Sequence, residues 1–376
     1  MTEFLLELYS EEIPPKLQIN ARTQLKQQLE TTLKNEGVHF KECLAYSSPT
    51  RLCLHIIGIP EKIKIKEKEV KGPKTGVSEN IIQGFIKSHN ISDKDLFKKE
   101  TEKGEFYFLK ISEKHILVEN LLIDVVPKTI STISWKKSMK WSTNNLIWGR
   151  PLRSIFALFN GKKLPFKLQH LDSTDIIIVE QDLVSKSRKV KSFKEYSSFL
   201  KENKIIFDQN ERQKIILKRF ISVSNSKNYK DRYNHYLLEE VVNIVENPHV
   251  LLVSFDKEYL KIPEEIIIST IEKHQKYFPL FDSRGKLTNH FFVVANKKDE
   301  KKLISEGNKR VVDARLADAK FFWEKDRSKN LIKQIANLKT VTFYEKLGTI
   351  YDKTQRIRNL ARLLSDELDI NKEKVQ

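Results

Sequence analysis

The chain has little of several features that would define its class. Only two of its 376 residues are cysteines, Cys43 and Cys53, which can form neither a disulfide framework nor a four-ligand zinc site. No apolar run approaches the roughly 18 residues that a membrane span needs. The N-terminus is acidic where a secretory signal is basic. Neither G-x-x-x-x-G-K-[ST] nor G-x-G-x-x-G occurs, so no phosphate-cradling loop is expected. We therefore expect a protein of the reducing cytoplasm with no membrane association.

A strong excess of positive charge is present instead. The 68 Lys and Arg residues against 50 Asp and Glu residues give a formal net charge of +18 at pH 7. Such a charge can attract a polyanion such as nucleic acid. The chain is also rich in Lys, Ile and Asn throughout, and scattered lysines raise net charge without forming a binding patch. Charge alone leaves nucleic-acid binding and a featureless basic surface equally open.

The hydrophobic patterns predict a globular, multidomain protein of mixed α/β (α+β) class with a helical C-terminal segment. A length of 376 residues and a hydrophobic content of 39% allow a sizeable core and two or three domains. We place an N-terminal α/β domain at 1–160 and a mixed α/β domain at 161–335. Residues 336–376 would begin a helical domain that is incomplete here.

In the first domain, a strand is expected over Phe4–Tyr9, then a helix that ends before Gly37, then a strand over Arg51–Ile59. Apolar residues recur every four positions in that helix, at Leu17, Ala21, Leu25, Leu29 and Leu33. Glu61–Lys74 alternates Lys and Ile with Glu and reads as an edge strand running into a loop. Phosphate contact through Lys71 and Lys74 is the less favoured alternative there. A helix over Ile116–Val126 should end or kink at Pro127.

Farther along, strands are expected at 176–179, 249–255 and 290–295, and helices at 192–202, 210–225 and 308–326. Pro263 is placed to begin a helix that Pro279 ends. From Leu338 onward the pattern is helical. The helix over 308–326 should pack through an apolar stripe at Val311, Val312, Leu316, Ala319, Phe322 and Trp323.

Indole and basic side chains alternate over one short stretch, which makes it the best candidate for RNA contact. Indoles stack on unpaired bases, and cations neutralise phosphates. The alternative, equally favoured, is that the tryptophans belong to the core and the cations extend from its rim. The candidate residues are Trp135, Lys136, Lys137, Lys140, Trp141, Arg150 and Arg153, with Trp148 among them.

A second group of residues is a candidate for a partner interface. His274 and Tyr277 are expected in one helical turn with Lys273 and Lys276, although a hydrogen-bonded structural histidine is the favoured interpretation of His274. Arg315 stands three residues before Asp318, a spacing that more often gives a local ion pair than an interface. His249, Asp282 and His290 lack any paired-ligand spacing, so no metal site is expected.

Six segments of unusual sequence occur in order along nearly the whole chain. They are SEEIPP at 10–15, SPTRL at 48–52, WGRPLRSIFALF at 148–159, HQKYFPLFD at 274–282, RLADAKFFWEKD at 315–326 and LKTVTFYEKLGTIYDKTQRI at 338–357. With these segments the chain resembles the N-terminal portion of the β subunit of the bacterial tetrameric glycyl-tRNA synthetase.

The resemblance implies a subunit that positions tRNA(Gly) while a separate α subunit performs the chemistry, in an α2β2 assembly. ATP, with Mg, would be bound by the α subunit, and this chain would contain no catalytic residue and no cofactor. Consistent with that division, HIIG at 55–58 and KKSMK at 136–140 do not qualify as the class I synthetase signatures, since HIIG lacks the second histidine and lies within an expected strand. The arginine-bearing strands that form a class II catalytic core are not found either. The resemblance also implies that a helical domain related to HD phosphohydrolases begins near 336 and is truncated.

The chain departs from that family's pattern at two points. Residues 174–190 read TDIIIVEQDLVSKSRKV where relatives usually have a GHRF-type segment, and no His-Asp dipeptide occurs, so HD-type hydrolysis is not expected. The early C-terminus suggests a truncated or split product, or a fragment. It also motivates an alternative hypothesis, a stand-alone RNA-binding or scaffold protein that no longer serves aminoacylation.

Overall fold

The computed structural model describes residues 2–65, 68–89, 96–101, 104–111, 114–141, 145–181, 184–230 and 232–368. The chain divides into two compact units. The first comprises Met1–Lys227, Tyr233–Val250 and Val294–Lys298, and the second comprises Asn228–Arg232, Leu251–Val293 and Asp299–Gln376. Both units mix helices and strands, which confirms the predicted fold class. The predicted three-domain division stays a prediction.

The first unit is built on a central sheet with strand order β11-β12-β9-β1-β3-β2, and β10 also pairs with β9. β1 lies at the middle and pairs antiparallel with both β3 and β9, whereas β12 runs parallel to β9. The strands are β1 (Glu3–Ser10), β2 (Glu42–Ser48), β3 (Arg51–Ile57), β9 (Leu152–Phe159), β10 (Lys162–Lys163), β11 (Lys167–Leu168) and β12 (Leu171–Thr174).

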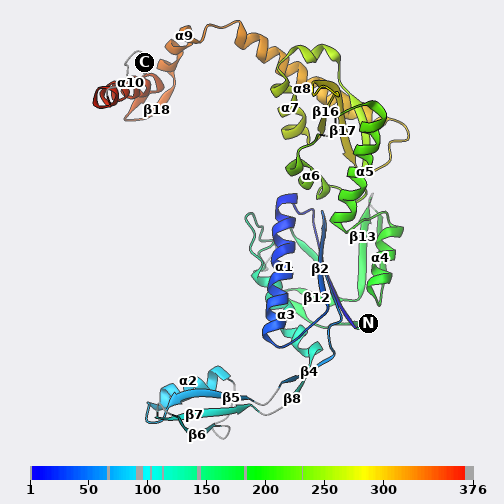
Figure 1. Cartoon of the computed structure of the whole chain (residues 1–376), viewed down its shortest axis with the longest axis vertical. Helices are drawn as coiled ribbons and strands as arrows, with labels where there is room; N and C mark the ends of the chain where they lie inside the picture. The colour runs from blue at the N-terminus through cyan, green and yellow to red at the C-terminus, as the bar shows by residue number, and fades with distance from the viewer. Residues whose placement is uncertain are drawn as a thin grey trace. The chain divides into compact units, whose positions relative to one another are not determined.

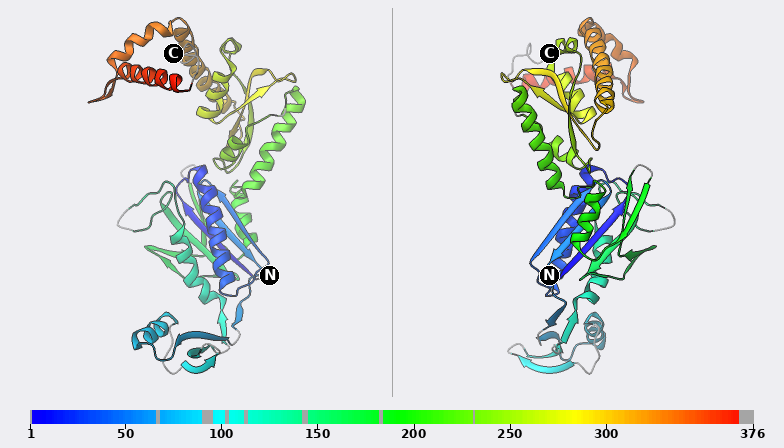
Figure 2. Two further views of the ribbon diagram at one scale, coloured as in Figure 1. Left: turned by 60° about the vertical axis from the view of Figure 1, so that its left-hand side comes forward. Right: turned by 90° about the vertical axis from the view of Figure 1, so that its right-hand side faces the viewer.

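Both faces of this sheet are covered, which gives three layers (Figures 1 and 2). Helices α1 (Pro15–Asn35) and α3 (Val118–Thr132) pack on one face, over β1 residues such as Phe4 and Leu6. On the other face, Leu5 packs with a layer formed by the hairpin β13 (Ile176–Gln181) and β14 (Val184–Lys189) and by α4 (Phe193–Glu202). A strand between two apolar layers is hydrophobic on both sides, which explains why Phe4, Leu5 and Leu6 are apolar in succession and all buried.

The local predictions for this unit are largely confirmed. All five Leu and Ala residues of the predicted four-residue repeat are buried on α1. Pro127, however, does not end α3, which continues to Thr132. The reason is tertiary: Thr129 and Ile130, beyond the proline, are buried with the rest of the helix face, and packing outweighs a local helix-breaking residue. The predicted strand 176–179 alternates, with Ile177 and Val179 buried but Ile176 exposed.

The segment that follows β3 forms more strands than the sequence indicated. Instead of one edge strand and a loop, 61–74 contains β4 (Lys62–Ile65), which pairs with β8 (Lys114–Leu117), and β5 (Lys68–Lys74). β5 joins β6 (Leu96–Thr101) and β7 (Gly104–Ile111) in a separate antiparallel sheet beside α2 (Glu79–His89) (Figure 1). Two further helices complete the unit, α5 (Gln209–Lys227) and α6 (His235–Val242).

The second unit has a three-stranded sheet of order β15-β17-β16, made by β15 (His249–Ser254), β17 (Leu287–Ala295) and β16 (Phe278–Phe281). The 3-10 helix η2 (Lys257–Lys261), α7 (Glu264–Ser269), the π-helix η3 (Thr270–His274) and the long helix α8 (Leu303–Arg327) pack around it. The helix predicted to continue to Pro279 in fact ends near His274, and Pro279 lies within β16. β16 is the edge strand of its sheet, where proline is tolerated.

The prediction that the chain is helical from Leu338 onward is only partly correct, because a short hairpin interrupts the helices. α9 (Leu331–Gln334) and the 3-10 helix η4 (Ile335–Thr340) precede a hairpin of β18 (Thr342–Tyr344) and β19 (Gly348–Thr349), and α10 (Ile350–Glu367) follows. Gly348 has a φ of +77° and so permits the turn that a helical pattern would not reveal. Thr349 and Asp352 form a capping box that starts α10.

Candidate functional site

Three of the unusual segments, far apart in sequence, meet at one end of the central sheet. Ser10 N–H donates to Thr50 O across 2.8 Å, Ile13 N–H donates to Pro49 O across 2.6 Å, and Glu11 N–H donates to Pro151 O across 2.9 Å. SEEIPP, SPTRL and WGRPLR are therefore tied together by backbone hydrogen bonds. We call residues 10–15, 48–52 and 148–153 the motif cluster.

A buried ion pair supports the motif cluster from within. Arg51 Nη1 donates to Glu7 Oε2 across 2.8 Å, and Tyr196 Oη donates to the same oxygen across 2.6 Å. Arg51 Nη2 also donates to Ile178 O across 2.6 Å, which joins the β2–β3 turn to β13. Burial by itself lowers the pKa of Arg51, but the adjacent Glu7 carboxylate raises it, and the net direction is upward. Arg51 is thus a charged structural residue that cannot contact an external ligand.

Two guanidinium groups lie against the ring of Tyr9. The Arg51 guanidinium carbon is 4.6 Å from the ring centroid and that of Arg153 is 5.8 Å from it. The exposed Arg153 forms a two-bond ion pair with Glu180 and lies 3.6 Å from Glu11. Arg153 is therefore on the surface as an RNA-contact residue must be, but a phosphate would compete with Glu180 for it.

The tryptophans of the basic, indole-rich segment point toward the core. Trp148 is fully buried and donates its indole N–H to Ser10 Oγ across 3.1 Å, while Trp135 and Trp141 are half-buried against the same core. The Trp135 ring covers Gly149 so closely that an added Cβ would lie 2.4 Å from two ring carbons. Sequence alone leaves core and stacking roles open. The structure fixes Trp148 in the core, so it cannot stack on a base.

The lysines of the segment are exposed on a loop that is anchored at both ends. Lys136, Lys137 and Lys140 all face solvent. At one end, Ser134 N–H donates to Gln24 Oε1 across 2.9 Å. At the other, Met139 and Trp148 exchange backbone hydrogen bonds of 2.7 and 3.2 Å. Arg150 is half-buried and bonds to Gly149 O, so the exposed positive charge of this segment comes chiefly from the lysines.

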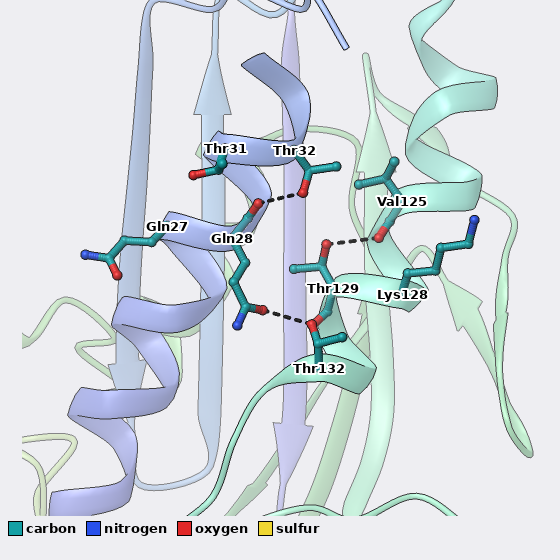
Figure 3. Close-up of a pocket in the computed structure, with 8 residues that line it drawn as sticks. All are labelled: Gln27, Gln28, Thr31, Thr32, Val125, Lys128, Thr129 and Thr132. Carbon is teal, nitrogen blue, oxygen red and sulfur yellow. Dashed lines mark hydrogen bonds between the residues drawn. The ribbon is translucent and has the colours of Figure 1, made fainter. Parts of the chain in front are cut away.

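Beside this loop, α1 and α3 form a shallow groove of about 430 Å³ that sequence reasoning did not find (Figure 3). Thr132 Oγ1 donates to Gln28 Oε1 across it, at 3.0 Å. The groove can hydrogen-bond a polar ligand, but it holds no nucleophile paired with a base. The one sequence signal for this groove is the occurrence of two neighbouring polar pairs on α1, Gln27 with Gln28 and Thr31 with Thr32. Its lining residues are Gln27, Gln28, Thr31, Thr32, Val125, Lys128, Thr129 and Thr132.

In the second unit, the structure joins HQKYFPLFD to α8. The half-buried Tyr277 donates its hydroxyl to Asn308 Oδ1, and its ring stacks on Phe291 with 5.4 Å between centroids. His274 is exposed at the end of the π-helix, a helix type frequent at functional sites. Lys276 has a φ of +61°, so the chain turns sharply between His274 and Tyr277 and does not hold them in one regular helical turn.

Helix α8 presents two different faces. Val312 and Leu316 are buried, with Ala319 and Trp323 packed beside them. Val311 and Phe322, predicted in the packing stripe, are instead 43% and 58% exposed, because only a narrow stripe of the helix is buried, where it packs against η2 and η3. Arg315 lies on this exposed face. Within the described part of α8 an ion pair forms between Lys309 and Asp313, and Lys320 pairs with Glu258, whereas the expected Arg315–Asp318 ion pair is not formed.

No three His, Cys, Asp or Glu side chains in the described ranges come together as a metal site. None of the helices described has the length and apolar content required to cross a bilayer. Cys43 and Cys53 are buried free thiols, and burial raises the pKa of Cys43 to about 12.

Comparison with known proteins gives one consistent result. Residues 4–376 match the family model described as glycyl-tRNA synthetase beta subunit. The chain is 35% identical over 372 residues to a glycine–tRNA ligase beta subunit of Rickettsia prowazekii, which covers 98% of this chain and 56% of the relative. It is 36% identical over 379 residues to the corresponding subunit of Clostridioides difficile, covering 98% and 55%. The chain thus spans about half the length of these relatives.

Proposed function

The chain belongs to the glycyl-tRNA synthetase beta subunit family, and from this premise we propose that it holds tRNA(Gly) for ATP-dependent glycylation by a separate α subunit. The observation that carries the proposal is the family match over nearly the whole chain. In this role the chain supplies position: a tRNA held with its terminal adenosine at the reacting centre lowers a barrier by avoiding the entropy cost of encounter.

The proposed tRNA contact is the anchored loop with Lys136, Lys137 and Lys140, extended by Arg150 and Arg153 of the motif cluster. Its support is geometric and electrostatic. The three lysines are exposed, and hydrogen bonds at both ends limit the freedom that the loop would lose on binding. Trp135 and Trp141 are half-buried and would serve mainly to fix the loop, with their remaining exposed edges available to the RNA.

The proposed contact with the α subunit is on the second unit, at His274 and on the exposed face of α8 around Arg315. Exposed aromatic side chains beside an arginine are typical of protein interfaces, and Phe321 and Phe322 flank this face at 59% and 58% exposure. Tyr277 would act through its bond to Asn308, which holds the HQKYFPLFD turn against α8. Loss of α-subunit binding in a pull-down with Arg315→Glu and Phe322→Ser, but not with Arg358→Glu at an exposed position of α10, would support this contact.

Adenylate formation belongs, in this proposal, to the α subunit, which would bind glycine, ATP and Mg²⁺. The buried charge pair of Glu7 and Arg51 has a structural role in this chain. The assembly would be α2β2. The two buried free thiols are compatible with a reducing cytoplasm.

The test is attachment of glycine to tRNA(Gly) by purified α subunit, with and without this chain. Stimulation by the chain is expected. An α subunit equally active without a folded preparation of the chain, or a chain that binds neither tRNA nor α, would overturn the proposal. Heat-unfolded chain is the matched control, since it adds the same charge without the fold.

A further inference from the structure

The sheet β5-β7-β6 contains lysines and aromatic rings that have no part in the function proposed above. The central strand β7 contains Phe106, Tyr107 and Phe108 in succession. In the β5–β7 register, Lys71 stands opposite Phe108 and Lys74 opposite Phe106. In the β6–β7 register, Lys99 stands opposite Phe106. The aromatic strand is thus flanked by lysines on both sides.

These residues share one face of the sheet. Residues directly opposite in an antiparallel pair point to the same side, and alternate residues along a strand point to opposite sides. Lys71, Lys74, Lys99, Phe106 and Phe108 therefore lie together, with Phe97, which stands opposite Phe108. Glu100 and Glu105 stand opposite each other in the register, and their side chains lie on the other face of the sheet.

The side chains form a layered arrangement on this face. Lys71 Nζ lies 3.5 Å from the centroid of the Phe106 ring, and Lys99 Nζ lies 5.5 Å from that of Phe108. Phe108 is only 8% exposed, whereas Phe97 and Phe106 are partly exposed and the three lysines are exposed. Ammonium groups held over aromatic rings keep their positive charge near the surface, while the rings offer flat apolar area.

We propose that this face of the β5-β7-β6 sheet binds single-stranded RNA, with Lys71, Lys74 and Lys99 on phosphates and Phe106 and Phe97 stacking on unpaired bases. Basic surfaces that contain aromatic rings are the common design for single strands, because every base has a π-face and every nucleotide a phosphate. The inference rests on the proposed function in that RNA is the partner. It assigns a second contact surface, separate from the Lys136–Lys140 loop, for an unpaired part of the tRNA.

The experiment measures binding of the full chain to a fluorescent, unstructured ten-nucleotide RNA by anisotropy between 50 and 200 mM salt. The test variant is Lys71→Ala/Lys74→Ala/Lys99→Ala. Its matched control is Lys162→Ala/Lys163→Ala/Lys167→Ala, which removes equal charge from exposed residues on and beside the short strands β10 and β11. We expect the test variant to lose about tenfold in affinity at low salt and its salt slope to fall by about 2, while the control changes little.

A second pair of variants separates stacking from charge. Phe106→Leu is expected to weaken binding about fivefold or more, since it removes a base-stacking ring. Phe108→Leu, at a buried position, should leave the affinity of the folded protein nearly unchanged, and circular dichroism checks that both variants fold. Equal binding by the wild type and the lysine variant, or no binding of the oligonucleotide by the wild type, overturns the inference. The glycylation test with α subunit is scored separately, so either proposal can fail alone.

Discussion

Arg51 and Glu7 form an ion pair of 2.8 Å in which the two side chains are 1% and 2% exposed. The pair connects SPTRL to the middle strand β1, and through Tyr196 and Ile178 O it reaches the layer on the far face of the sheet. A charged pair at this depth is costly to break but not necessarily stabilising as a whole, because both charges lose their hydration.

Glu7→Gln is expected to reduce the free energy of unfolding by about 3 to 5 kcal/mol, because it leaves the Arg51 guanidinium buried without a counter-charge. The double variant Glu7→Gln/Arg51→Met should recover much of that loss, since the amide oxygen can still accept from Tyr196. Urea denaturation of the two single variants and the double variant measures the coupling. Simple additivity of the single effects would contradict the interpretation.

Gly149→Ala is expected to destabilise the first unit by about 1 to 3 kcal/mol, because its methyl group would overlap the Trp135 ring. It should also weaken tRNA binding, since Trp135 immediately precedes the lysine loop. Adding Trp135→Leu to Gly149→Ala relieves the overlap and should restore stability. Thermal melts and tRNA anisotropy on the same samples make the comparison. A stable Gly149→Ala protein would show that the ring is free to move.

Glu180→Gln releases Arg153 from its ion pair. If Arg153 contacts tRNA, its guanidinium is then opposed only by the weaker contact with Glu11 at 3.6 Å, and tRNA affinity should rise by up to about fivefold, the range of an exposed ion pair. Arg153→Ala should lower affinity, and Arg153→Ala/Glu180→Gln should behave like Arg153→Ala alone. An increase with Glu180→Gln that persists without Arg153 would point to general repulsion of RNA by the carboxylate.

Lys136→Ala/Lys137→Ala/Lys140→Ala is expected to weaken tRNA binding and to lower the slope of log affinity against log salt by about 3, one for each lost phosphate contact. The variant with Lys162, Lys163 and Lys167 replaced is again the control for net charge. Filter binding over a salt series gives both slopes. Parallel slopes for the two variants would remove the loop from the tRNA contact without affecting family membership.

Stability should fall at alkaline pH through Cys43. Burial raises the pKa of this thiol from 9.0 to about 12, so the folded state keeps the proton longer than the unfolded state does. The contribution is complete below pH 9 and decreases toward pH 12, by up to about 1.4 kcal/mol per pH unit. Urea midpoints at pH 7 and pH 10 measure the loss, and Cys43→Ala should reduce it. An identical alkaline loss in Cys43→Ala would assign the effect to other groups.

The sequence predicted the elements whose apolar residues repeat regularly. The four-residue repeat from Leu17 to Leu33 required a helix, and it is one. A local signal failed at Pro279, which lies within β16 instead of ending a helix, and of the two outcomes predicted at Pro127, an end or a kink, the end does not occur. Local signals also failed for the second half of 61–74, where strand pairing with distant β7 decides the structure.

For the candidate site too, the sequence identified the residues, and the tertiary structure decided their exposure. The residue types and their spacing along the sequence were enough to pick out the indole-rich segment, His274, Tyr277 and Arg315, and the order of six segments was enough to indicate the family. Which side of each segment is exposed was decided only by the tertiary structure. Trp148 is buried because its indole reaches Ser10, which lies 138 positions earlier in the chain, while Lys136 and Lys137 nearby remain in solvent. Burial depends on contacts between distant segments, and a local pattern does not contain that information.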